Sequence, residues 1–152
     1  MSLDVDALMD KLVSKAAATG TLDSVNKHEP KSAPGNQLHA AVWLQDFGPV
    51  PAGSGLSMTT ARVELALRIY SNMVQEPQDE IDPDVGRATT KIIAAISEDY
   101  TLGDTVKAVD LLGMAGAPLR ARAGYLNVAG SMYRVMTIFA PLLVNDAWTQ
   151  TP

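Results

Sequence analysis

The sequence predicts an α+β domain with a mainly antiparallel sheet and two helices packed on it, because strand-like runs are grouped between helical patterns. The expected order is helix, three strands, helix, three strands. The clearest strand covers residues 63–70, where Val63, Leu65, Leu67 and Ile69 alternate with mostly polar neighbours. With 152 residues, no repeat and no long linker, the chain is expected to form one domain over 1–152.

The first half of the chain predicts one helix and three strands. Asp4 is a suitable N-cap for the helix, and Gly20 follows its end. Two prolines and a glycine in residues 28–36, HEPKSAPGN, indicate an exposed loop, and residues 48–55, GPVPAGSG, predict a mobile projection. The expected elements are a helix over 4–19, strands over 22–27 and 37–47, and the long strand that includes 63–70.

The second half begins at a polar corner, residues 75–80, after which Asp82 and Pro83 predict an N-cap and a first helical residue. Ala129 and Gly130 indicate a hairpin turn between the last two strands. The last strand has apolar residues on both faces, which predicts a central position in the sheet. The expected elements are a helix over 82–97 and strands over 105–112, 119–128 and 131–144.

Composition narrows the function classes. A net charge of −5 and a pI near 4.8 disfavour nucleic acid as a main partner. The absence of cysteine excludes disulfides and thiolate metal sites. No apolar stretch approaches the roughly 20 residues of a membrane span, and the acidic N-terminus is unlike a signal peptide, so we expect a cytosolic protein without a membrane partner. Seven methionines and Trp148 fit either an assembling surface or an ordinary core.

The sequence offers few candidates for chemistry. His28, Glu29 and His39 would be neighbours if the strands on either side of the loop pair, which leaves open a small metal-dependent enzyme. Asp82 and Asp84 resemble the start of a calcium loop, but Pro83 and the missing distal glutamate break that pattern. No phosphate-binding loop or serine nucleophile motif occurs. We therefore expect no catalytic residue, no metal and no cofactor.

Charged residues suggest contact surfaces instead. Arg120 and Arg122 share parity, and the hairpin returns Arg134 nearby, so the three arginines are expected to converge on one sheet face. The acidic corner could pair with them across a subunit boundary, or each group could be a solvated face. The candidate interface residues are His28, Glu29, Pro30, Lys31, Gln75, Glu76, Gln78, Asp79, Glu80, Arg120, Arg122 and Arg134.

Several segments together resemble the tail terminator proteins of long-tailed bacteriophages, particularly those that infect actinobacteria. The resemblance spans about residues 28–148. It rests on HEPKSAPG (28–35), the approach at 54–56, RVELALRIYSNMVQEPQDEIDP (62–83), VDLLG (109–113), AGYL (123–126) and YRVMTIFAPLLVND (133–146).

The resemblance implies a virion structural protein and an α+β fold. Such proteins form a ring, usually a hexamer, that caps the tail tube at its head-proximal end, stops tube polymerisation and provides the docking surface for head-completion proteins of the neck. It implies assembly in the host cytoplasm, with the tail tube protein and head-completion protein as partners. It also places subunit contacts in the HEPKSAP loop and the QEPQDEIDP corner. The alternatives are another tail or neck component, such as a tube or head-completion protein, and the metal-dependent enzyme above.

Overall fold

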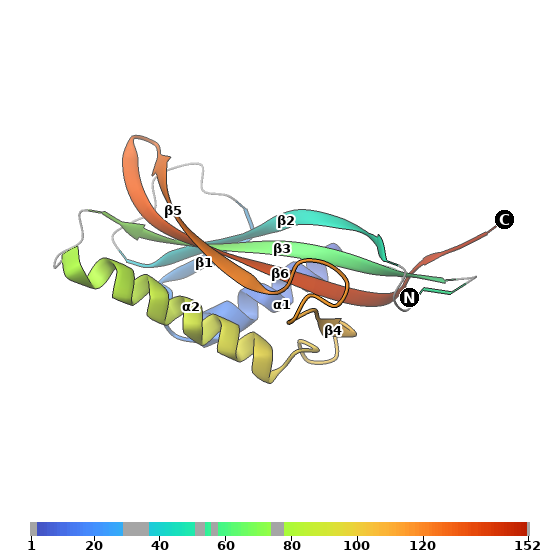
Figure 1. Ribbon diagram of the computed structural model, residues 1–152. Helices are drawn as coiled ribbons and strands as arrows, with labels where there is room; N and C mark the ends of the chain where they lie inside the picture. Colours follow the sequence, from blue (N-terminus) through green and yellow to red (C-terminus); the bar gives the residue numbers. More distant parts are fainter. Residues whose placement is uncertain (1–2, 29–36, 51–53, 56–57, 74–77, 152) are drawn as a thin grey trace.

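The computed structural model describes residues 3–28, 37–50, 54–55, 58–73 and 78–151 (Figure 1). Within them the order is helix, three strands, helix, three strands, so the predicted α+β class is confirmed. Asp4 caps the first helix, accepting a hydrogen bond from the Ala7 N–H at 3.1 Å, and Gly20 follows it with φ +72°. The elements are α1 (Val5–Ala18), β1 (Ser24–Asn26), β2 (His39–Val50), β3 (Met58–Asn72), η1 (Gln78–Glu80), α2 (Ile81–Glu98), β4 (Ala108–Val109), β5 (Arg120–Val128) and β6 (Ser131–Thr149).

The strands of the described chain form one sheet in the order β1-β2-β3-β6-β4, and β5 also pairs with β6. β3 and β6 form its centre. β6 pairs with β3 along one side, and along the other with β5 at residues 131–139 and with β4 at residues 142–143. All pairings are antiparallel except that of β1 with β2. The predicted central position of the last strand is confirmed, and so is the hairpin turn at Ala129 and Gly130.

One face of the sheet, the helix face, carries the main core. The odd-numbered residues of β3 from Val63 to Ile69 are fully buried there, as the period of two predicts. Figure 1 shows α1 and α2 on the same side of the sheet. Their apolar stripes, including Leu12 of α1 and Ile92 of α2, join β3 and β6 in a single cluster. The two helices therefore leave the other face uncovered.

The uncovered face is nevertheless partly buried, because the sheet curls. A second cluster comprises Ala41, Tyr70, Tyr133 and Val135, and the two tyrosine rings meet edge to face at 6.2 Å between centroids. Figure 1 shows the β5–β6 hairpin bending away from the helices. The sheet itself thus encloses even-numbered side chains of β3. The alternation of apolar and polar residues alone would assign these side chains to solvent.

Several element boundaries differ from those predicted. α2 begins at Ile81 after the 3-10 turn η1, and its N-cap Glu80 makes no capping bond, so the predicted cap at Asp82 is wrong. Pro83 fits inside the first turn because its missing N–H would have no partner there. Residues 48–50, predicted as part of a projection, belong to β2 and pair with β3, while 51–53 lie outside the described residues. β4 has only two residues, and the strand predicted over 105–112 is therefore shorter than expected, although the Asp110 N–H still donates to the Pro141 carbonyl of β6.

Candidate functional site

The two histidines do not form a site together. β1 and β2 run parallel with Ser24 beside His39, and Ser24 Oγ lies 2.6 Å from His39 Nδ1. His28 is four residues further along and exposed, so the expected adjacency of the histidines is wrong. It would have required an antiparallel return across the loop. Glu29 lies outside the described residues, and in the described part of the chain no three His, Asp or Glu side chains are placed to hold a metal.

The three arginines occupy opposite faces of the sheet. Arg120 and Arg122 project from the uncovered face, whereas Arg134 is paired with the odd-numbered Tyr125 and lies on the helix face. Arg134 Nε donates to Asp82 of α2 at 2.9 Å, and its guanidinium stacks on the Tyr125 ring at 4.4 Å. The predicted convergence of all three is therefore wrong, because the register of β5 with β6 places Arg134 opposite an odd position.

On the uncovered face, Arg120 is engaged within the chain. Its Nη1 donates to Glu64 Oε1 at 2.9 Å, and its guanidinium lies 4.4 Å from the centroid of Phe139. Arg68 similarly stacks on Trp43 at 5.0 Å. Arg122 differs: it is exposed, and no ion pair joins it to any residue that the structure describes. Of the predicted basic group, Arg122 is thus the member left available for a partner.

The acidic corner is exposed where the structure describes it. Asp79 and Glu80 face solvent in η1, next to the N-terminus of α2, where negative charge complements the helix dipole. Asp82 is bound by Arg134, and Asp84 lies 2.9 Å from Arg87 one turn on, so each has a cation as neighbour. The predicted contact residues Pro30, Lys31, Gln75 and Glu76 lie outside the described residues.

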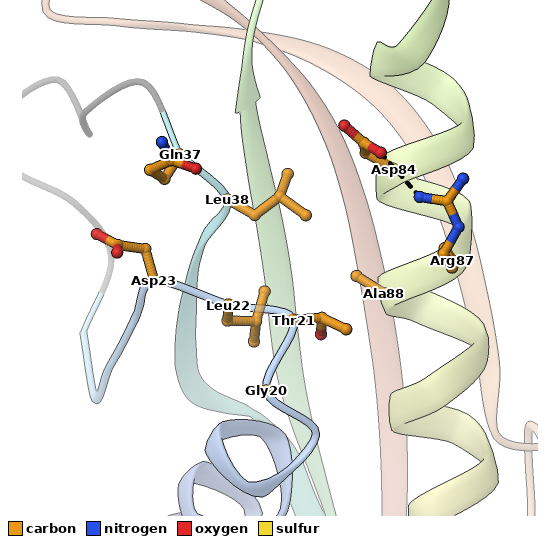
Figure 2. Close-up of a pocket in the computed structure, with 9 residues that line it drawn as sticks. All are labelled: Gly20, Thr21, Leu22, Asp23, Gln37, Leu38, Asp84, Arg87 and Ala88. Carbon is orange, nitrogen blue, oxygen red and sulfur yellow. Dashed lines mark hydrogen bonds and ion pairs between the residues drawn. The ribbon is translucent and has the colours of Figure 1, made fainter.

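A cleft of about 380 Å³ lies between the segment Gly20–Asp23 and α2. Figure 2 shows Asp84 and Arg87 on its helical wall, joined to each other along the helix, with Leu22 and Leu38 on the opposite side. The described lining residues include no histidine, and their Asp84–Arg87 pair is a one-turn helical contact of the kind common on solvated surfaces. Among these described residues the arrangement provides no nucleophile with an adjacent base.

Residues 111–118 form a loop with a fixed backbone, the 111–118 loop, which sequence reasoning did not single out. Asp110 is 3% exposed, and its two carboxylate oxygens accept hydrogen bonds from the Met114 N–H at 2.7 Å and the Ala115 N–H at 2.9 Å. Arg62 Nε lies 3.7 Å from Asp110 Oδ2, and the same guanidinium donates to the Ala117 carbonyl. A buried carboxylate and an arginine from β3 thus hold the loop.

The 111–118 loop displays apolar side chains. Leu112 is 86% exposed and Met114 is 88% exposed. The available sequence signal was two large apolar residues in a stretch rich in glycine and alanine, LLGMAGAP, which is unusual for an ordinary solvated turn. The prediction treated 111–112 as the end of a strand, because TVKAVDLL resembles one.

A second apolar surface group, the β2 patch, consists of the exposed Leu44 and Phe47 together with the partly buried Trp148. Leu44 is 37% and Phe47 is 50% exposed, and the Phe47 and Trp148 rings meet at 6.4 Å between centroids. The patch lies on the helix face near the end of the sheet. β1 pairs only with residues 39–41 of β2, so the outer edge of residues 42–50 has no strand partner among the described residues.

These features define an α+β protein whose described surface offers charged groups, apolar groups and open strand edges for binding. No helix among the described residues is both long and apolar enough to cross a bilayer.

Comparison with known proteins gives matches only among solved structures: no family model and no curated protein matches the chain. One similar structure is the sheath/tube terminator, in the extended state, of an extracellular contractile injection system determined by cryo-EM. The TM-score is 0.46 at 11% identity, over 100% of this chain and 61% of that one, so this chain spans less than two thirds of its length. Another is from the virion of a native gene transfer agent particle, with a TM-score of 0.39 at 13% identity, over 90% of this chain and 93% of that one.

Proposed function

We propose that this chain is a structural subunit of a phage tail, a terminator that forms a ring on the end of the tail tube and stops its polymerisation. Its partners would be further copies of itself, usually six in a ring, the tail tube protein, and a head-completion protein on the other side. The sequence resemblance over residues 28–148 supports this proposal. In this proposal the protein acts in the virion, at the head-proximal end of the tail.

The observation that carries the proposal is that the sheet is open at two opposite edges. The outer edge of β2 beyond Ala41 and the outer edge of β5 (Arg120–Val128) have no strand partner among the described residues. Unpaired N–H and C=O groups on an edge are a template for another chain. Two different edges on one subunit suit a heterologous contact, which generates a ring when its rotation closes.

Charged contacts would then add specificity. The predicted contact residues remain part of the proposal, with one change: Arg120 and Arg134 are bound within the chain, so Arg122 is the candidate to meet Asp79 and Glu80 of a neighbour. Changing Asp79 and Glu80 to lysine should reduce the oligomer mass measured by light scattering, whereas Glu98→Lys, at the exposed last residue of α2, serves as the control. An unchanged mass for the double variant would reject the corner as a contact.

The function itself is tested by adding the purified chain to polymerising tail tube protein and measuring tube lengths by negative-stain electron microscopy. A terminator should give shorter tubes with one extra ring at one end. Long tubes made by the chain alone would instead identify it as a tube protein, and unchanged tube lengths without end-bound rings would reject the proposal. The His39→Ala variant keeps every proposed contact residue and should cap tubes as well as the natural sequence does, since no catalytic histidine is involved.

A further inference from the structure

The 111–118 loop exposes Leu112 and Met114 from a backbone that is held in place. The hydrogen bonds to Asp110 and from Arg62 fix the loop to the sheet, so the exposure of these side chains is not a result of loose chain. Exposed apolar surface is unfavourable in water, and two exposed side chains of this size gain free energy when covered. A fixed apolar projection is therefore suited to insertion against another apolar surface.

The β2 patch is such a surface. Leu44 and Phe47 belong to the same sheet face as the main core, since they pair with Leu65 and Val63, but unlike those residues they are exposed. Phe47 and Trp148 provide two tilted aromatic rings in contact. The thioether of a methionine is flexible and polarizable and packs favourably against aromatic rings, so the chemistry of Met114 matches this patch.

The sheet register places the patch and the loop at the same level on opposite sides. Phe47 lies opposite Val63, Val63 opposite Leu142, and Leu142 opposite Val109, two residues before the start of the 111–118 loop. The row crosses three strand spacings, about 14 Å at roughly 4.8 Å each. A neighbouring copy placed beside the sheet, without sliding along the strands, would therefore bring its loop to the level of the patch.

We propose that copies of this chain bind head to tail, with Leu112 and Met114 of one copy seated on the Leu44, Phe47 and Trp148 patch of the next. A second copy is the occupant that fits, because one chain carries both surfaces at matching levels on opposite edges of its sheet. The contact is heterologous, so it builds a ring or continues as a filament. This contact depends on the proposed function in one respect only, namely that copies of the chain lie side by side.

Cross-linking tests the contact directly, because the natural chain has no cysteine. Pro49→Cys places one thiol beside the β2 patch, on the same face as Phe47, and Ala117→Cys places one in the loop; both positions are exposed. The two variants are mixed at high concentration with a short bis-maleimide. Dimers should form in the mixture and not with either variant alone. A mixture of Ala117→Cys with Ser97→Cys, an exposed position on α2, is the matched control.

Adding Leu112→Ser and Met114→Ser to the Ala117→Cys copy should lower the dimer yield by about tenfold or more, with an unchanged melting temperature because both side chains are exposed. Any of three results would overturn the contact. The dimers could be no more abundant than in the Ser97→Cys control, the links could form mainly between two Ala117→Cys copies, or the serine changes could leave the dimer yield unaffected. If the variants cross-link as expected but the chain leaves tube lengths unchanged, the contact is supported and the proposed terminator function is rejected. If the chain caps tubes but the variants do not cross-link, the terminator function is supported and the contact is rejected.

Discussion

Replacing Asp110 by asparagine should destabilise the protein and loosen the 111–118 loop. The change keeps the size of the side chain but removes its charge and turns one acceptor oxygen into an NH₂ donor that faces a backbone N–H. One charge-assisted hydrogen bond is lost, and the guanidinium of Arg62, whose side chain is 15% exposed, loses its counter-ion. The 3.7 Å separation of Arg62 Nε from the carboxylate is too long for a hydrogen bond, so the backbone bonds dominate.

A lost hydrogen bond to a charged group costs about 1.5–3 kcal/mol, and an unpaired charge adds to it, so we expect a total of about 3 kcal/mol. For a domain of this size that lowers the melting temperature by roughly 6–12 °C. Circular dichroism measures the melting curve, and limited chymotrypsin digestion reports cutting after Leu112, which should become faster. Asp146→Asn is the matched control because Asp146 is exposed. A shift below about 2 °C with unchanged cutting would refute the role assigned to Asp110.

Three further predictions concern single positions. Gly113→Ala should lower the free energy of unfolding, measured by urea titration, by about 2 kcal/mol or more, because Gly113 has φ +79° and a Cβ would lie 2.6 Å from a backbone carbonyl oxygen of the loop. Gly130→Ala is the control, because Gly130 has φ +86° but lies in open space, and it should lower the free energy of unfolding by less. Burial raises the pKa of Tyr133 in the folded protein. The contribution of the neutral tyrosine to folding stability is therefore complete below pH 10 and is lost as pH rises through the raised pKa of the folded state. Tyr133→Phe should therefore reduce the loss of stability above pH 10, and an equal alkaline loss in both proteins would contradict this. The hydrogen bond from Lys15 lowers the pKa of Asp99 in the folded protein. The contribution of the charged Asp99 to folding stability is therefore present above pH 3.8 and is lost as pH falls through the lowered pKa of the folded state. Asp99→Asn should thus show a smaller fall in melting temperature on acidification below pH 3.8, and an unchanged fall would show that the ion pair contributes nothing.

Much of the fold was predictable because it follows from local patterns. The period of two in residues 63–70 identified the buried face of β3, and the apolar residues on both faces of β6 identified a central strand. The helical stripes of α1 and α2 were equally clear, and the structure confirms the side-chain cap at Asp4. The predicted cap at Asp82 was wrong because a 3-10 turn, which sequence periodicity does not reveal, starts the second helix earlier.

The candidate surfaces were less predictable, because they depend on pairings between distant residues. Arg120 and Arg134 looked like free cations in the sequence, yet Glu64 and Asp82 bind them from 56 and 52 positions away. The prediction ended a strand at residue 112, inside the 111–118 loop. Composition could not reveal the bonds that hold this loop, because they need a buried Asp110 carboxylate and Arg62, which is far away in sequence.

The sequence by itself determined the kinds of element, their order and the face that each one buries, since these depend on neighbours a few residues apart. Only the tertiary structure decided three features. The first is the parallel pairing that separates His28 from His39, and the second is the register that divides the arginines between the two faces of the sheet. The third is the register of β2, β3, β6 and β4, which aligns Phe47 with the strand that precedes the 111–118 loop. The physical reason is that strand direction and register arise from contacts between segments far apart in the chain, and one residue of shift moves a side chain to the other face.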